Sequence, residues 1–134
     1  HLPNRIGVYI GFNEALSHLL MAGSDMMMIP SRFEPCGLVQ MYAMRYGSVP
    51  IVRMTGGLAD TVSHFDPKTG EGTGSVFRDA DANGLRWAVD TALTWYREAD
   101  DWARVQTNGM RCDFSWREQA PEYEALYRRT LAQL

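Results

Sequence analysis

Short apolar runs separated by segments of helical periodicity constrain the fold of this chain more than any other feature. The runs are Ile6 to Ile10, Met26 to Pro30 and Val49 to Val52, and a fourth short strand is expected at Ser75 to Phe77. Strands that alternate with helices are typical of βαβ units, which build parallel sheets. The pattern therefore predicts an α/β fold with a parallel sheet that begins at the first apolar run.

Local signals predict where the first two helices begin and end. Asn13 is placed to cap a helix that has Glu14 in its first turn and stops near Gly23. The next helix is expected from Leu38 to Tyr46. Gly47 follows it, where the left-handed cap conformation favours glycine.

After Phe77 the chain is expected to be helical from Asp81 onward. Asp101 is placed to cap a helix from Trp102 to about Met110, and Ser115 to Glu118 matches a capping box that starts the last helix. Pro121 predicts a restart or kink in that helix. One buried helical face is predicted, made of Leu85, Ala88, Val89, Ala92, Leu93 and Tyr96.

The length favours one domain rather than two. With 134 residues and 46% hydrophobic composition, the chain can build one compact core. We expect a βαβ core over residues 1–78 and C-terminal helices over residues 79–134. Four strands make only part of a doubly wound, Rossmann-like sheet, so the chain is interpreted as the last part of a larger domain.

Composition argues against several kinds of partner. A net charge of -3, with 13 scattered Lys and Arg, argues against nucleic acid. No apolar run approaches the roughly 20 residues of a membrane span.

Cys36 and Cys112 are too few for a disulfide framework and favour a reducing compartment, such as the cytoplasm or an organelle stroma. The three His share no metal-ligand spacing with Cys or carboxylates, so no metal site is expected.

Residues Ser31 to Leu38 form a short loop between an expected strand and an expected helix. Free backbone N–H groups at a helix N-terminus bind anions such as phosphate, and Gly37 leaves them unobstructed. The carboxylate of Glu34 lies in the same loop. From the residues alone, Glu34 is either part of a site or a solvated loop charge.

A second loop of similar design follows the next strand. There Thr55-Gly56-Gly57-Leu58 leads into Ala59 to Val62. Gly56 and Gly57 make either a plain tight turn or a close backbone approach to a ligand, and their place after a strand favours the ligand. In open α/β sheets ligands bind outside the carboxyl ends of the strands, so both loops are expected to face one crevice that takes a phosphate-bearing ligand.

Five stretches of the chain resemble the bacterial glycogen synthases and plant starch synthases. These are retaining glucosyltransferases with the two-domain GT-B fold. The matching stretches, in the family's order, are residues 10–18, 30–38, 43–47, 55–62 and 113–116, and the resemblance covers nearly the whole chain. It implies that the chain is the C-terminal half of the C-terminal, nucleotide-sugar-binding GT-B domain.

The resemblance also implies a reaction. In this family glucose passes from ADP-glucose to the non-reducing end of an α-1,4-glucan with retention, and no cofactor is implied besides the donor substrate. The family's phosphate-binding Arg and Lys lie upstream of the segment matching His1, and the site is completed by the N-terminal GT-B domain. The isolated chain is therefore expected to be inactive, and the family's location implies bacterial cytoplasm or plastid stroma.

Individual residues take roles from the matching motifs. The carboxylate matching Glu34 contacts the donor sugar and is needed for activity, which makes it the catalytic candidate. Backbone amides matching Cys36, Gly37 and Leu38 hold the distal phosphate. The ring matching Phe12, usually a Tyr, packs on the adenine, although a ring at a strand end is also a common core residue.

Two other functions stay open on the sequence. One is a non-catalytic nucleotide- or glucan-binding module. The other is a different GT-B transferase that uses UDP-glucose. Related transferases carry a second Glu where this chain has Tyr42, and the synthases share the lack of that Glu, so the motif favours the synthases.

Overall fold

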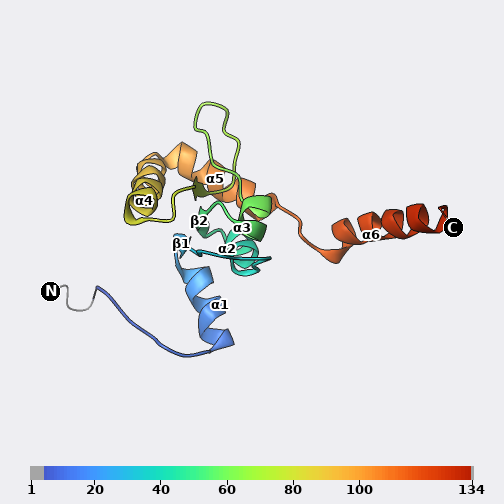
Figure 1. The fold of residues 1–134 in the computed structure, drawn as a ribbon. Coiled ribbons are helices and arrows are strands. Elements are labelled where there is room, and N and C mark those ends of the chain that lie inside the picture. The colour runs from blue at the N-terminus through green and yellow to red at the C-terminus, as the bar shows by residue number, and fades with distance from the viewer. Residues whose placement is uncertain (1–4, 134) are drawn as a thin grey trace.

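A three-stranded parallel sheet forms the centre of the computed structural model, which describes residues 5–133. The strands are β1 (Met26–Ile29), β2 (Val49–Arg53) and β3 (Ser75–Phe77), in the order β1-β2-β3. Met26 pairs with Val49, and Ile51 pairs with Ser75. Figure 1 shows β1 and β2 next to each other, with the helices around them. The predicted α/β class with a parallel sheet is confirmed.

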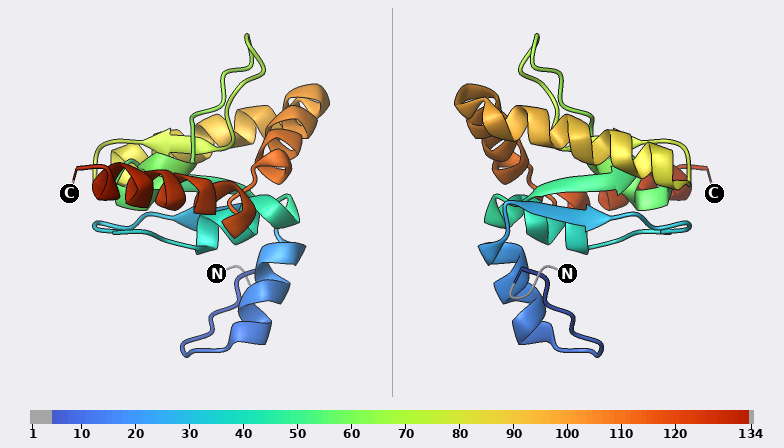
Figure 2. Two further views of the ribbon diagram at one scale, coloured as in Figure 1. Left: turned by 90° about the vertical axis from the view of Figure 1, so that its right-hand side faces the viewer. Right: turned by 90° about the vertical axis from the view of Figure 1, so that its left-hand side faces the viewer.

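Six helices in the described residues connect and flank these strands. They are α1 (Glu14–Gly23), α2 (Val39–Tyr46), α3 (Gly56–Thr61), α4 (Ala82–Arg97), α5 (Ala99–Arg111) and α6 (Trp116–Leu131). Figure 2 shows α4 on one side of the sheet and α2 on the other. None of these helices combines the length and apolar character needed to cross a bilayer within residues 5–133.

The side chains of β2 alternate between two hydrophobic clusters. Val49 and Ile51 face the larger cluster, which α4 and α5 complete with Ala88, Ala92, Trp95 and Val105. Val52 faces the smaller cluster with Met44, Leu58 and Val62. Because both faces of the strand are covered, β2 is apolar along nearly its whole length, as strands of parallel sheets are.

The predicted caps of α1 and α2 and the cap of α4 are present. The Asn13 Oδ1 accepts a hydrogen bond from the Leu16 N–H at 2.9 Å, and the Asp81 Oδ1 accepts one from the Gly84 N–H at 2.8 Å. Gly47 has φ 82°, and its N–H donates to the Met44 carbonyl at 3.0 Å. These caps fix where α1 and α4 begin and where α2 ends.

The prediction of a strand at Ile6 to Ile10 is wrong. The segment makes no strand in the described residues, and Val8 and Ile10 are 81% and 94% exposed. A strand requires a hydrogen-bonded neighbour, and each of the three strands pairs only within the sheet described above. The sequence alone makes the segment apolar, but the segment is buried as a strand only if another strand pairs with it.

The start and buried face of the C-terminal helices differ from the prediction. α5 begins at Ala99, so Asp101 lies inside the helix and does not cap it. On α4, Trp95 is buried and Tyr96 is exposed, the reverse of the predicted face at that turn. The reason is packing: the Trp95 ring meets Phe65 edge-on at 5.2 Å, whereas Tyr96 meets Trp102 at 5.0 Å nearer the surface.

The last helix also departs from the prediction. Ser115 occupies the N-cap position of α6, but its side chain makes no capping hydrogen bond. α6 continues without interruption through Pro121. The restart predicted at Pro121 is therefore wrong, because a proline removes only one backbone hydrogen bond from a helix. A kink at this position stays a prediction.

Candidate functional site

Two loops meet at the carboxyl ends of β1 and β2. The Glu34 loop, defined here as Ser31 to Leu38, follows β1, and the turn from Met54 to α3 follows β2. The Gly57 N–H donates to the Glu34 carbonyl at 3.2 Å and to the Pro35 carbonyl at 3.3 Å. The structure thus brings the two predicted loops together at one edge of the sheet.

Gly56 and Gly57 lie directly against the Glu34 loop. A Cβ atom would lie 1.8 Å from the Glu34 carbonyl oxygen at Gly56, and 1.7 Å from the Cys36 carbonyl oxygen at Gly57. The close neighbour of both glycines in the structure is therefore the backbone of the other loop. Their contact with a ligand stays a prediction.

Gly37 takes a conformation that other residues rarely adopt. Its φ is 72°, and a Cβ atom there would lie 2.7 Å from Gln40 Oε1. Gln40 is fully buried below the loop. Glycine is thus required at position 37 by both the backbone conformation and the side chain beneath it.

The carbonyl groups of the Glu34 loop point into the protein. Those of residues 31, 32, 34, 35, 36 and 37 all accept hydrogen bonds from neighbouring elements. In a trans peptide unit the N–H points away from the preceding carbonyl. The N–H groups of Cys36, Gly37 and Leu38 are therefore directed outward, and within residues 5–133 no acceptor bonds them.

The N-terminus of α2 adds to this set of free donors. Leu38 occupies the N-cap position without a side-chain cap, and the first turn holds no acidic residue. The first N–H groups of a helix have no partner inside it, and the helix dipole favours negative charge at this end. The arrangement suits an anion.

Glu34 is half-buried at the base of its loop. The Ser31 hydroxyl donates to Glu34 Oε2 at 3.5 Å, a long contact that leaves the carboxylate available for other partners. The outward N–H groups begin two residues later. The loop therefore places a carboxylate beside a site for an anion.

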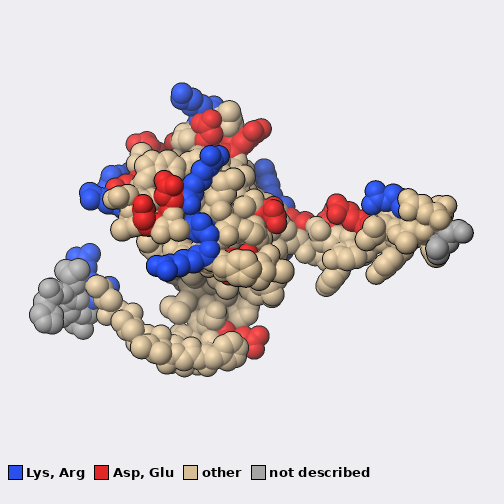
Figure 3. All heavy atoms as spheres, in the orientation of Figure 1, with Lys and Arg blue, Asp and Glu red and all other residues tan. Residues whose placement is uncertain are grey.

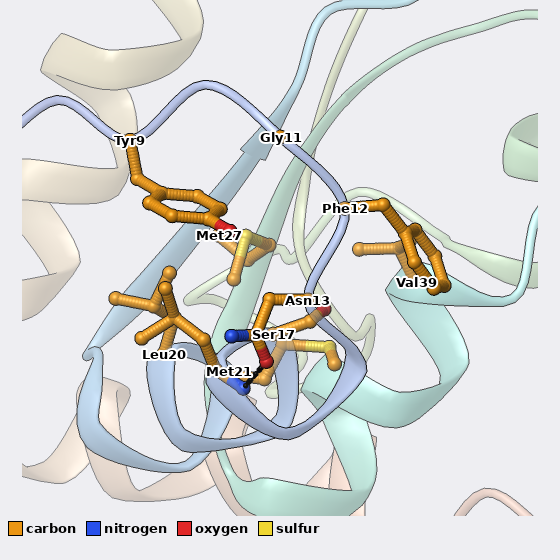
Figure 4. Close-up of a pocket in the computed structure, with 10 residues that line it drawn as sticks. Tyr9, Gly11, Phe12, Asn13, Ser17, Leu20, Met21, Met27 and Val39 are labelled. Atoms are coloured by element: carbon orange, nitrogen blue, oxygen red, sulfur yellow. Dashed lines mark hydrogen bonds between the residues drawn. The ribbon is translucent and has the colours of Figure 1, made fainter.

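Phe12 lies near the same helix end. Its side chain is 93% exposed, so in residues 5–133 it is not a core residue. With Val39, the first residue of α2, it lines a surface pocket of about 290 Å³ (Figure 4). The rest of the lining is largely apolar and includes Tyr9, Leu16, Leu20, Met21 and Met27. An apolar pocket thus adjoins the free N–H groups of α2.

Sequence reasoning missed two residues that support the site. Arg53 ends β2, and Gln40 lies in the first turn of α2; both donate hydrogen bonds to carbonyls of the Glu34 loop. The available signals were an Arg at the end of an apolar strand and a Gln on the buried face of a helix. No group of three or more His, Cys, Asp or Glu side chains in the described part of the chain is arranged to hold a metal ion.

Comparison with known proteins identifies relatives along nearly the whole chain. The family model of glycosyl transferases group 1 matches residues 2–107. Glycogen synthase of Histophilus somni is 51% identical over 128 residues, which are 93% of this chain and 27% of that protein. Glycogen synthase of Thermotoga maritima is 48% identical over 133 residues, covering 98% and 27%. The chain spans about a quarter of the length of these relatives.

Solved structures of related synthases also match nearly the whole chain. The catalytic domain of starch synthase IV from Arabidopsis thaliana, bound to ADP and acarbose, matches with a TM-score of 0.82 and 45% identity over 92% of this chain and 26% of that one. Sucrose-phosphate synthase from Thermosynechococcus elongatus matches with a TM-score of 0.67 and 29% identity, covering 98% and 32%. The resemblance to glycogen and starch synthases is confirmed, and the chain belongs to the glycosyl transferases group 1 family.

Proposed function

We propose that this chain is the nucleotide-sugar-binding part of a glycogen or starch synthase. The complete enzyme transfers glucose from ADP-glucose to the non-reducing end of an α-1,4-glucan and retains the configuration at the anomeric carbon. The observation that carries the proposal is the set of outward N–H groups at Cys36, Gly37 and Leu38 beside Glu34. It stands in a chain about half identical to glycogen synthases.

The proposed chemistry depends on where charge develops. The bond between the anomeric carbon and the phosphate oxygen breaks, and its electron pair stays on ADP. The acceptor hydroxyl oxygen forms the new bond to the anomeric carbon, and its proton passes to the phosphate oxygen of the leaving ADP. N–H groups aimed at the distal phosphate stabilise the charge on the leaving ADP, and the negative charge of Glu34 lies near the positive charge on the sugar ring.

ADP is the proposed nucleotide. The structural neighbour from Arabidopsis was solved with ADP, and the exposed ring of Phe12 offers a face for the adenine next to α2. Gly56 and Gly57 complete the proposed donor site. We propose that the reaction uses ADP-glucose without a cofactor or metal.

The proposal assigns the remaining functions to other parts of the enzyme. The relatives are about four times as long as this chain, so the acceptor glucan and the opposing N-terminal GT-B domain are proposed partners. The chain alone is then inactive. Within it, the proposed division is into a βαβ part over residues 1–78 and C-terminal helices over residues 79–134. The free cysteines Cys36 and Cys112 fit the reducing conditions of bacterial cytoplasm or plastid stroma.

Binding is tested on the 134-residue chain by titration with ADP and with UDP, followed by amide chemical shifts. We expect shifts centred on Cys36 to Leu38 that are stronger with ADP. Gly37→Val abolishes them because φ is 72° at that position and Gln40 fills the space below. Gly23→Ala is the matched control, since nothing lies within 4 Å of its added Cβ. A folded chain whose amides do not respond to either nucleotide contradicts the proposed site.

Catalysis is tested in a chimera in which this chain replaces the matching quarter of Thermotoga maritima glycogen synthase. We expect glucan synthesis from ADP-glucose, and a loss of at least about 100-fold in kcat for Glu34→Gln. Glu98→Gln, an exposed carboxylate between α4 and α5, is the control with unchanged activity. Binding of ADP by a folded chimera that makes no glucan indicates a non-catalytic binding module instead.

A further inference from the structure

The Glu34 loop has no regular secondary structure, yet side chains from two neighbouring elements hold its backbone. Arg53 at the end of β2 binds the first part of the loop, and Gln40 in α2 binds the last part. The Gly57 N–H of α3 binds the middle. Loops usually rely on their own turns or on water for their carbonyl groups, so three external donors along eight residues are a specific support.

Arg53 holds the beginning of the loop with a forked contact. Its Nε donates to the Ser31 carbonyl at 2.9 Å, and its Nη2 donates to the Arg32 carbonyl. No carboxylate of residues 5–133 lies within 4.0 Å of the guanidinium, which is half-buried. The guanidinium of Arg53 therefore bonds the two carbonyls rather than a carboxylate, and its planar, forked geometry fits both carbonyls at once.

Gln40 holds the end of the loop from below. Its Nε2 donates to the Gly37 carbonyl at 3.0 Å and lies 3.3 Å from the Cys36 carbonyl and 3.1 Å from Thr61 Oγ1. The Thr61 hydroxyl donates to the Gly57 carbonyl at 2.6 Å. Gln40 thus connects the loop to α3.

The orientation of Gln40 indicates that the nitrogen contacts decide its position. The side chain is fully buried, where a polar group is costly unless it is hydrogen-bonded. Its Oε1 has no partner in the described residues and lies beneath Gly37. The hydrogen bonds that its Nε2 makes to the loop therefore compensate for the unpartnered Oε1.

We infer that Arg53 and Gln40 are positioning residues of the donor site, which hold the carbonyls of the Glu34 loop inward so that the N–H groups of Cys36, Gly37 and Leu38 face the phosphate. The inference rests on the proposed function for the identity of the ligand. The geometry of the loop itself does not depend on that identity. Neither side chain touches the ligand, and both act through the backbone.

The first test measures the loop without ligand. In the 134-residue chain, ¹⁵N relaxation gives the order parameters of the Cys36, Gly37 and Leu38 amides. We expect values near about 0.85 in the parent chain and below about 0.6 in Arg53→Met and Gln40→Met, because the carbonyls lose their donors. Unchanged order parameters in both variants would overturn the inference, whether or not the chain binds ADP.

The second test measures the effect on the donor. In the chimera with the Thermotoga maritima enzyme, we expect KM for ADP-glucose to rise about tenfold in Arg53→Met and Gln40→Met, with KM for the glucan unchanged. Tenfold corresponds to about 1.4 kcal/mol, the size of one or two net hydrogen bonds. Arg53→Lys keeps the charge but loses the fork, so it is expected to fall between Arg53→Met and the parent.

The matched control is Ser75→Ala. It also removes one buried side-chain hydrogen bond, from Ser75 Oγ to the Ala88 carbonyl at 2.9 Å, but far from the loop in sequence and on β3. A purely structural effect lowers the active fraction, and hence kcat, without moving KM, and Ser75→Ala should show that pattern. If Arg53→Met and Gln40→Met behave like Ser75→Ala in a chimera that uses ADP-glucose, the inference fails while the proposed function stands.

Discussion

Two atoms decide which residues can stand at positions 56 and 57: the carbonyl oxygens of Glu34 and Cys36. Any side chain would place its Cβ within 1.8 Å of one of them, far inside the contact distance. The loops would have to separate, which would break the hydrogen bonds of the Gly57 N–H. At the scale of single residues, the two loops can therefore make contact only because the residues at positions 56 and 57 have no Cβ atom.

We expect Gly57→Ala to lower the free energy of unfolding by about 3 kcal/mol or more, because overlap with backbone has no cheap relaxation. Gly56→Ala adds backbone strain, since φ is 44° there. Urea denaturation measures both. Gly23→Ala, in a helix and with open space around it, should change stability by no more than about 1 kcal/mol and in the stabilising direction. Equal stabilities for Gly57→Ala and Gly23→Ala would contradict the geometry.

His64 gives the chain a dependence of stability on pH. Its Nδ1 accepts a hydrogen bond from the Val76 N–H at 3.1 Å, and its ring stacks on Trp87 at 5.4 Å. Burial lowers the pKa of His64, and the charge of Asp66 opposes this only in part. The unfolded chain therefore binds the proton more readily, so the contribution of His64 is complete above pH about 6.5 and declines as the pH falls below that value.

We expect the urea midpoint of the parent chain to fall between about pH 7 and pH 5 more steeply than that of His64→Gln. Gln keeps an acceptor for the Val76 N–H and does not titrate, so the change isolates the proton. Parallel midpoint curves for the two proteins over this range would show that His64 does not contribute to the slope.

At the scale of elements, one side chain fixes the start of α4. Asp81 Oδ1 satisfies the Gly84 N–H, one of the helix donors that would otherwise lack a partner. We expect Asp81→Ala to lower the free energy of unfolding by about 1 kcal/mol, measured by urea denaturation. Asp81→Asn keeps the accepting oxygen and should change stability little. A loss in Asp81→Asn as large as in Asp81→Ala would show that the charge of Asp81, rather than the cap, is what matters.

The sequence predicted those elements that depend on neighbours a few residues away. The caps at Asn13 and Gly47 and the strands β1, β2 and β3 needed only local patterns. The prediction of a strand at Ile6 to Ile10 was wrong because a strand also needs a pairing partner, and the residues of the segment do not determine whether one is present. The buried side of α4 near Trp95 failed because aromatic packing with Phe65, rather than helical spacing, decides it.

The candidate site divides in the same way. The Glu34 loop and Gly37 were found because a strand, a loop and a helix start follow one another in the sequence. The role of Arg53 was missed because its acceptor on Ser31 lies 22 residues away in the sequence. Gln40 was missed although the Gly37 carbonyl lies only three residues away, because a Gln in the first turn of a helix is usually exposed rather than buried beneath a loop. Contacts between elements become visible only when the sheet is assembled.

At the scale of the whole molecule, α6 stands apart from the body. Figure 1 shows it extending beyond the sheet and its covering helices, and none of its residues is buried. Its exposed apolar residues are Trp116, Tyr123, Leu126, Tyr127 and Leu131. On the face drawn in Figure 3, basic and acidic side chains are interspersed over the body.

We expect removal of residues 116–134 to leave the thermal midpoint of the remaining chain within about 2 °C, because no core contact is lost. The same truncation should reduce self-association in sedimentation velocity experiments, since it removes exposed apolar surface. Gln119→Ala in the intact chain, an exposed polar change on α6, should alter neither quantity. A clear drop in the midpoint after truncation would mean that α6 packs against the body.

The order of strands in the sheet has a consequence for synthesis on the ribosome. β1 and β2 each pair with the strand that follows them in the chain, so these three strands can pair in the order in which they are translated. The groups that hold the Glu34 loop, on Gln40, Arg53 and Gly57, are all translated soon after it and before β3. The two loops at the carboxyl ends of β1 and β2 can therefore take shape while the C-terminal helices are still being made.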